Sequence, residues 1–546
     1  MNKRYTGLAL VVLALLAWSV VYPNVSVVAG TFVHGLRDWR IFFTSPADHE
    51  ALLNTIIIAV ASVAAAVAIG IPLAFLLTRF EFRGRRFMSA VATLPAALPP
   101  LVGVIAFMFL YGESGVVTRG VQALFGLSRA PWSFTGIWAI VFVHAYTMYV
   151  YVFLFVSAGL ERYDSSLDEA AEGLGATPAF RLRRVTLPLL TPSIIGSMLL
   201  VFMSALGSFS APYIFGGGAR VLSTQILVSK LNGSMGMAYV ETAMLVITAV
   251  VALAVLRWIE RRREYAMAGK GRVARAAVRS RFWRWAAPAV AAVAVVFLVL
   301  PHAMVVLVSF ARDGAWTTQV LPPQYTLDNF RRLATDPDLL QPITNSVSMA
   351  AIATGANVVV CFLAAYLLVL SRAPGKKLLA LLVALPWAIP ATAIALGLAA
   401  TFDRNSLASA RLLLVGTFWI LPLAYFIRNI PVVTNAIEGS LRQMDPTLED
   451  AARGLGASWT LAMRRVVLPA ARPGLVAGGM LAAVAAVGEF VASIVLYSHD
   501  NRPISMEILS QLRGLSFGTA AAYSVLLIAL VLAITTGARW AESRMA

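Results

Sequence analysis

Long apolar stretches recur along the whole chain and are separated by short polar segments. Each stretch has about 20 residues or more, the length that a helix needs to cross the hydrocarbon core of a bilayer. Backbone groups in hydrocarbon must be hydrogen-bonded within their own segment, so we expect helices rather than open strands. Twelve spans are expected, near residues 7–30, 52–78, 88–111, 134–159, 187–213, 238–259, 285–310, 343–370, 377–402, 409–436, 470–497 and 516–538.

Composition supports this interpretation. Of the 546 residues, 59% are hydrophobic and 13% are charged, whereas soluble domains have about 25% charged residues. An ordinary soluble globule is therefore excluded, and we expect an all-α polytopic membrane protein. The single cysteine, Cys361, lies in an apolar run, so neither an internal disulfide nor a thiolate metal cage is available.

The net charge of +18 comes from 44 Lys and Arg against 26 Asp and Glu. Basic residues cluster in the connections Arg79–Arg86, Arg257–Arg284 and Arg372–Lys377, on the same side as Lys3 and Arg4. Cytoplasmic loops carry the excess of Lys and Arg, so both termini are expected in the cytoplasm. Because Arg257–Arg284 lies between two spans, we interpret it as a linker near anionic lipid rather than a nucleic-acid-binding arm.

One segment of the chain is duplicated. Asp164–Pro192 aligns with Asp445–Pro473 at an offset of 281 residues, and 14 of the 29 aligned positions are identical. Upstream residues repeat at an offset of 291: Asn54, Gly84, Leu94, Pro95 and Pro99 recur as Asn345, Gly375, Leu385, Pro386 and Pro390. The ten extra residues of the first half are placed most easily in the loop at 112–132.

Two six-span halves follow, repeated in the same orientation about a pseudo-two-fold axis along the membrane normal. The expected domains are a first half at 1–260, a basic linker at 261–284 and a second half at 285–546. A long cytoplasmic loop follows the fourth span of each half, at 161–186 and at 437–469.

Both loops have the pattern of a short helix, a glycine and a second helix. Ser166 and Glu169 are spaced as a capping box, Gly175 suits a left-handed helix end, and Thr177 suits the cap of the next helix. The second copy repeats these positions as Thr447, Asp450, Gly456 and Ser458.

Each short helix has an apolar stripe at helical spacing. The stripes consist of Leu167, Ala170, Ala171 and Leu174, and of Leu448, Ala451, Ala452 and Leu455. Helices of two turns do not persist alone in water, so each stripe must pack against something. Two alternatives stay open: packing on the second helix or on neighbouring spans, or docking into a groove on a soluble partner, of which two copies would then be needed.

The loop resembles the Glu-Ala-Ala signature of the permease subunits of binding-protein-dependent ABC importers. That signature is Glu-Ala-Ala, three residues, Gly, nine residues, Ile, one residue and Leu-Pro. The first copy matches at Glu169, Ala170, Ala171, Gly175, Val185, Leu187 and Pro188, and the second at Asp450, Ala451, Ala452, Gly456, Val466, Leu468 and Pro469. Valine replaces isoleucine twice, and Asp450 replaces glutamate.

The resemblance implies a fused permease with a type I ABC importer-like fold, in a bacterial inner membrane. It implies that Glu169–Gly175 and Asp450–Gly456 are coupling helices, that the partners are two copies of an ATP-binding cassette subunit and an extracytoplasmic solute-binding protein, and that ATP and magnesium bind the partner ATPase rather than this chain. The subfamily most resembled transports ferric iron, with thiamine, phosphonate, polyamine and oxyanion permeases as alternatives.

Catalytic and metal motifs are not expected in this chain. Neither Gly269-Lys270 nor Gly375-Lys376 has the earlier glycine of a phosphate-binding loop, so ATP hydrolysis is expected elsewhere. His49-Glu50 begins a zinc-protease pattern, but Leu53 replaces its second histidine. We therefore predict no enzyme activity and no metal site.

Glu489 is an acid well inside a late span, and it aligns with Ser208 of the first half. Charge in a membrane is costly and faces a cavity or a partner, so we expect a pathway or gate role for Ser208, Phe209, Glu489 and Phe490, or else a structural partner such as a serine or backbone donor. Glu489 would suit a cationic solute, although related oxyanion permeases also have an acid here. In a different class of protein, an ion-coupled secondary transporter, Glu489 would be a protonation site.

Another polar group lies in the fourth span: His144, Tyr146 and Tyr149, which we interpret as packing residues.

Overall fold

The computed structural model describes residues 3–164, 166–261, 276–277, 281–316, 319–371, 374–405, 409–445 and 447–544. Eleven helices in this part of the chain are long and apolar enough to cross a membrane, and a bent helix pair brings the number to twelve. The fold is therefore the predicted all-helical membrane fold with two six-span halves.

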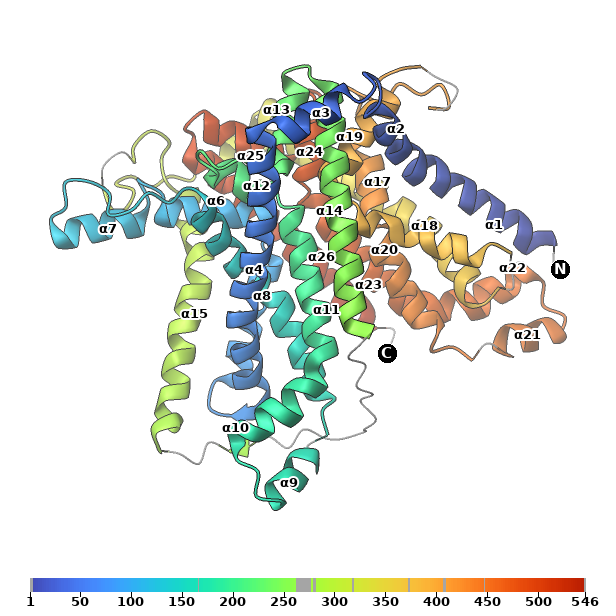
Figure 1. Ribbon diagram of the computed structural model, residues 1–546, viewed down its shortest axis with the longest axis horizontal. Helices are drawn as coiled ribbons and strands as arrows, with labels where there is room; N and C mark the ends of the chain where they lie inside the picture. Colours follow the sequence, from blue (N-terminus) through green and yellow to red (C-terminus); the bar gives the residue numbers. More distant parts are fainter. Residues whose placement is uncertain are drawn as a thin grey trace.

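Fourteen helices form the first half (Figure 1): α1 (Lys3–Leu16), α2 (Tyr22–Gly30), α3 (Arg37–Thr44), α4 (Pro46–Arg79), α5 (Arg85–Ala92), α6 (Pro100–Tyr111), α7 (Val116–Phe125), α8 (Ile137–Glu161), α9 (Ser166–Gly173), α10 (Pro178–Arg181), α11 (Leu187–Leu206), α12 (Ser210–Phe215), α13 (Leu222–Leu231) and α14 (Met235–Arg261). Two-residue strands, β1 (Phe80–Glu81) and β2 (Ala276–Ala277), pair in parallel.

Twelve helices form the second half: α15 (Arg281–Ser309), α16 (Asp328–Thr335), α17 (Pro337–Val369), α18 (Lys376–Ala388), α19 (Ala391–Phe402), α20 (Ile420–Leu441), α21 (Thr447–Gly454), α22 (Trp459–Ala462), α23 (Leu468–Val487), α24 (Val491–Leu496), α25 (Ile504–Arg513) and α26 (Phe517–Ser543). The equivalent spans are α4 and α17, α8 and α20, α11 and α23, and α14 and α26.

The third span of each half is broken, although the sequence predicted continuous helices at 88–111 and 377–402. Leu98 and Ile389 have extended backbones, each directly before a proline, Pro99 or Pro390. Proline disfavours helical geometry in the preceding residue, so each helix ends there and a new one begins. In the second half, α18 and α19 meet at a bend of 108°.

The fifth span of each half begins and ends earlier than the predicted segments 187–213 and 470–497, at Pro178–Leu206 and Trp459–Val487. Helix α11 ends at Gly207 and α23 ends at Gly488, and the chain continues in the short helices α12 and α24. Glycine is a poor helix former, so both breaks fall at a residue of low helix propensity. These breaks place Ser208 and Glu489 in non-helical backbone between two helices.

The first span of each half packs against the other half. Helix α2 lies against α19, and α15 lies against α5 and α6; Figure 1 shows α1 on the side of α18 and α15 at the opposite edge. Trp18 meets Phe402 edge-on with ring centroids 5.5 Å apart, and the Tyr146 hydroxyl donates to the Leu298 carbonyl at 2.7 Å. The first span of each half therefore holds the two halves together, one span on each flank of the molecule.

Most of the predicted basic linker, at 262–275 and 278–280, lies outside the described residues. Domain boundaries and the cytoplasmic position of the termini therefore stay predictions.

Candidate functional site

The two short helices of the duplicated loops are exposed along their apolar stripes. Leu174 is 90% exposed and Leu455 is 91% exposed, and Leu167 and Leu448 are also exposed. Helix α9 has no buried residue, and Figure 1 shows it projecting at the opposite end of the molecule from α3 and α13. Each short helix contacts the helix and π-helical turn that follow it, but the leucines of its apolar stripe are not covered by the chain.

Both helices end as predicted, at a glycine with a left-handed backbone. Gly175 has φ +83° and Gly456 has φ +88°. The Ala176 N–H donates to the Ala171 carbonyl at 3.0 Å, and the Ala457 N–H donates to the Ala452 carbonyl at 3.1 Å. These bonds are those of a Schellman motif, which a side chain at either glycine would strain.

The predicted capping boxes are wrong. Ser166 and Thr447 are the first helical residues, and the acceptors at the two helix starts are Asp164 and Asp445. The Ser166 N–H donates to Asp164 at 3.0 Å, and the Thr447 N–H donates to Asp445 at 2.9 Å. These backbone hydrogen bonds lower the pKa of both carboxyl groups, because they stabilise the ionised form.

The predicted caps of the next helices are present. The Thr177 hydroxyl accepts from the Phe180 N–H and the Ser458 hydroxyl accepts from the Leu461 N–H, both at 3.3 Å. Each of these helices runs through a π-helical turn, Leu182–Thr186 or Met463–Val467, into the fifth span. A displacement of α9 or α21 is thereby connected to α11 or α23.

Asp168 anchors α9 to the body of the first half. Its carboxylate pairs with Arg79 at the end of α4 at 2.6 Å. The same carboxylate accepts from the Tyr163 hydroxyl at 2.8 Å and from the Thr186 hydroxyl at 3.3 Å. The neighbouring acid, Glu169, is exposed. The acid that matches the Glu-Ala-Ala signature is therefore not the acid that anchors the helix.

Glu449 is the equivalent anchor in the second half, with different partners. It is buried and accepts from the Tyr366 hydroxyl at 2.9 Å. Trp459 donates its ring N–H to the same hydroxyl at 3.1 Å. Sequence analysis missed both anchors, and the available signal was an acid directly before Glu169 and Asp450 in both copies.

The broken spans of the two halves meet reciprocally. A Cβ atom on Gly488 would lie 3.1 Å from Pro99 of the first half, and a Cβ atom on Gly207 would lie 3.7 Å from Pro390 of the second half. Each helix break after a fifth span therefore packs against the proline break of the opposite third span. Small residues at such crossings allow the backbones to approach closely.

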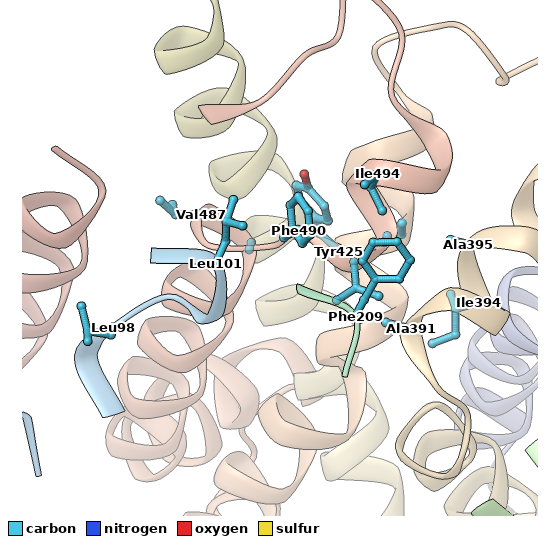
Figure 2. Packing of buried hydrophobic residues seen from close by; sticks show 14 of the residues in the cluster. Leu98, Leu101, Phe209, Ala391, Ile394, Ala395, Tyr425, Val487, Phe490 and Ile494 are labelled. Atoms are coloured by element: carbon cyan, nitrogen blue, oxygen red, sulfur yellow. The ribbon is translucent and has the colours of Figure 1, made fainter. Parts of the chain in front are cut away.

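Phe209 and Phe490 meet between these breaks, with ring centroids 5.9 Å apart and an interplanar angle of 61°. Both rings are buried. Figure 2 shows them within an apolar layer that both halves contribute, in which the labelled neighbours are Leu98, Leu101, Ala391, Ile394, Ala395, Tyr425, Val487 and Ile494. This layer is closed by side chains of both halves.

Glu489 is held by two groups of its own half. Its Oε2 accepts from Arg428 Nη1, and its Oε1 accepts from the Ala492 N–H at 2.9 Å, at the start of α24. The aligned Ser208 instead bonds His144 at 2.9 Å, and His144 bonds Ser62 at 2.9 Å. Glu489 thus belongs to an ion pair in the second half, whereas the aligned Ser208 belongs to a series of side-chain hydrogen bonds in the first half.

The partner of Glu489 was therefore predicted only in part: the backbone donor was expected and the arginine was not. Arg428 could have been suspected from the sequence, since it is the one charged residue in the apolar stretch 409–436 apart from Arg411 near its start. Tyr146 and Tyr149 donate to backbone carbonyls, which agrees with their interpretation as packing residues.

We call the apolar layer around Phe209 and Phe490 the phenylalanine layer. The halves are also joined by a second reciprocal pair of contacts, between α13 and α24 and between α25 and α12. Lys230 of α13 donates to the Val495 carbonyl of α24, and Arg513 of α25 contacts Tyr213 of α12. These contacts close the α12/α13/α24/α25 end of the molecule. Within the described residues, no three His, Cys, Asp or Glu side chains come together as metal ligands.

A comparison with protein families decides the classification. The model of the binding-protein-dependent transport system inner membrane component matches twice, at residues 66–265 and 357–546. The chain belongs to this family. The two matches cover most of the chain and correspond to the two halves of the fold, so the protein is a fused two-half permease of the inner membrane with many spans.

Named relatives differ in what they transport. The permease is 29% identical to a probable ABC transporter permease, y4fN, of Sinorhizobium fredii, over 84% of this chain and 81% of the relative. It is 24% identical to the ferric transport system permease FbpB of Actinobacillus pleuropneumoniae, over 99% and 78%. It is 30% identical to the molybdenum transport system permease ModB of Mycobacterium bovis, over 40% and 83%.

We predict that replacing Arg428 lowers the free energy of unfolding more than replacing Glu489 does. Replacing Arg428 with Gln leaves a buried carboxylate unpaired, which costs about 3–5 kcal/mol of unfolding free energy. Replacing Glu489 with Gln costs less, because the Arg428 side chain is 41% exposed and stays hydrated. The double variant should recover most of the loss. Unfolding of the four proteins in lipid nanodiscs measures this order, and equal losses in the two single variants would contradict it.

We also predict that each anchor acts on its own helix. Asp168→Ala should speed amide hydrogen exchange in α9 by on the order of tenfold, as expected for losing a charge-assisted bond, without changing α21. Glu449→Ala should speed amide hydrogen exchange in α21 without changing α9. Glu169→Ala and Asp450→Ala are matched controls at exposed neighbouring positions. Exchange that rises in both helices, or after the control substitutions, would refute independent anchoring.

Proposed function

We propose that the permease is the membrane subunit of an ATP-driven importer. In this proposal two copies of an ATP-binding cassette subunit dock on α9 and α21. A solute-binding protein docks on the opposite, extracytoplasmic face. Glu169, Ala170, Ala171 and Gly175 form one docking surface for the ATP-binding cassette subunits. Asp450, Ala451, Ala452 and Gly456 form the other. ATP and magnesium bind to the partner subunits, and both termini of the permease are cytoplasmic.

The observation that carries the proposal is the matched exposure of two apolar stripes. Leu174 and Leu455 occupy equivalent positions and are almost fully exposed, and each belongs to an exposed apolar stripe of the kind that marks an interaction site. Two equivalent surfaces suit two copies of one partner. The family, whose members depend on a binding protein, supports the second partner.

The conformation suits the inward-facing state of an alternating-access cycle. The contacts of Lys230 and Arg513 hold together the end that we assign to the outside, and Phe209 and Phe490 close the layer beneath it. Closure of the two ATPase subunits would bring α9 and α21 together and separate the outer contacts. ATP and the loaded binding protein must both prefer that second state in order to drive the cycle.

The proposed solute is an ion or a small polar molecule. Ferric iron is supported by the FbpB relatives, which align with nearly the whole chain, and an oxyanion is supported by the molybdenum permeases. The alternative of an ion-coupled secondary transporter has less support, because it requires Glu489 to be free for protonation and Glu489 is paired with Arg428.

We expect glutamate at Leu174 and Leu455 to abolish docking of the ATPase, because a charge would have to be buried without a partner. The double variant L174E/L455E should lose co-purification with the ATPase subunit, and its thermal unfolding should not change, since both side chains are exposed. Leu231→Glu is the matched control: that leucine is 75% exposed on α13, near the opposite end. Normal co-purification of the double variant would defeat the proposed docking surfaces.

A further inference from the structure

The open face of α20 is unusual for a helix inside a membrane protein. Its residues are mostly buried, but one stripe is exposed: Arg428, Asn435, Gly439 and the C-cap residue Arg442 just past its end, with the half-buried Val432 between the first two. The steps of four, three, four and three residues place them on one side of the helix. A stripe facing lipid would be apolar, so this polar side faces water.

Arg428 lies at the inner end of this stripe. Its partner Glu489 directly precedes Phe490, whose ring meets Phe209 of the first half in the closed apolar layer, so Arg428 lies close to the contact between the halves. The exposed stripe therefore runs along α20 from that layer toward the duplicated loops.

The two members of the ion pair offer very different surfaces to a solute. Glu489 is 7% exposed, and both of its carboxylate oxygens are occupied by protein donors. The Arg428 side chain is 41% exposed, and in the described part of the chain only Nη1 has a protein acceptor. A guanidinium has five N–H donors, so most of them point to water or to a ligand.

We propose that Arg428 is a binding group for the transported solute, and that this solute has negative charge or acidic oxygens where it passes the closed layer. The proposal rests on the importer function proposed above and names its class of substrate: an oxyanion, or a metal ion carried as an anionic carboxylate complex. A bare cation is not the class that this surface fits.

Physical chemistry favours this class over the cation suggested by Glu489 in the sequence. A guanidinium binds carboxylates and tetrahedral oxyanions through two parallel N–H bonds, which fixes their orientation. A cation would instead have to displace Arg428 from a buried carboxylate. The equivalent position in the first half is Thr147, so only one half supplies the charge.

Protection of Arg428 from chemical modification tests the proposal on the wild-type permease in lipid nanodiscs. Phenylglyoxal modifies guanidinium groups that water can reach, and peptide mass spectrometry measures the rate at each arginine. The probes are sodium molybdate, sodium citrate, ferric citrate and spermidine chloride at equal ionic strength. Arg442 is the internal control, because it lies on the same face of α20, pairs with Glu438 at 2.9 Å and has a 65% exposed side chain.

We expect molybdate or a citrate species to slow modification of Arg428 about threefold at twice its dissociation constant, following simple occupancy, and to leave Arg442 unchanged. Protection by molybdate alone identifies an oxyanion, and protection by citrate or ferric citrate identifies a carboxylate complex.

Three results would overturn the proposal. These results are resistance of Arg428 to phenylglyoxal throughout, protection by spermidine and by no anion, and protection no greater than that of Arg442. The assay contains no ATPase subunit, so its outcome is separate from the co-purification result that tests the proposed function.

Discussion

A reciprocal contact between helix breaks joins the two halves of the molecule. The break after each fifth span, at Gly207 or Gly488, packs against the proline of the opposite broken third span. Neither half can complete this layer alone, because each supplies the glycine to one contact and the proline to the other. The Phe209 and Phe490 rings then close the space between the two contacts. Helix α10 or α22 and a π-helical turn join α9 or α21 to α11 or α23, so each loop is continuous with a span that ends at this layer.

The two halves share a backbone plan and differ in charge. The backbone carbonyls of Ser208 and Glu489 accept from Ser223 and Ser505, both at 2.7 Å, so the loops around the two breaks are held in the same way. The side chains diverge at Glu489 and Arg428, where the second half has an ion pair. Duplicated halves can keep a common backbone arrangement at the helix break while the side chains beside it diverge.

Hydropathy and repetition predicted the features that depend on local sequence. The spans follow from apolar length, the ends of α9 and α21 from Gly175 and Gly456, and the pairing of halves from the duplicated segment. Hydropathy could not predict the breaks at Pro99 and Pro390, because apolar residues continue through them. The packing of α15 on the first half could not be predicted either, since an apolar surface does not specify which neighbour covers it. Arg428 and Glu489 are 61 residues apart, and pairing over that separation depends on tertiary structure.

In the proposed transport cycle, the phenylalanine layer separates when ATPase subunits that have bound nucleotide are docked on the loops. Cysteines at positions 209 and 490, introduced with Cys361→Ser, can be joined by a short bifunctional thiol reagent. We predict efficient cross-linking in the permease alone and in the nucleotide-free complex, and loss of cross-linking when the complex is trapped with ATP and vanadate. Cross-linking that is equally efficient in the trapped complex, or that is absent from the permease alone, would contradict the account.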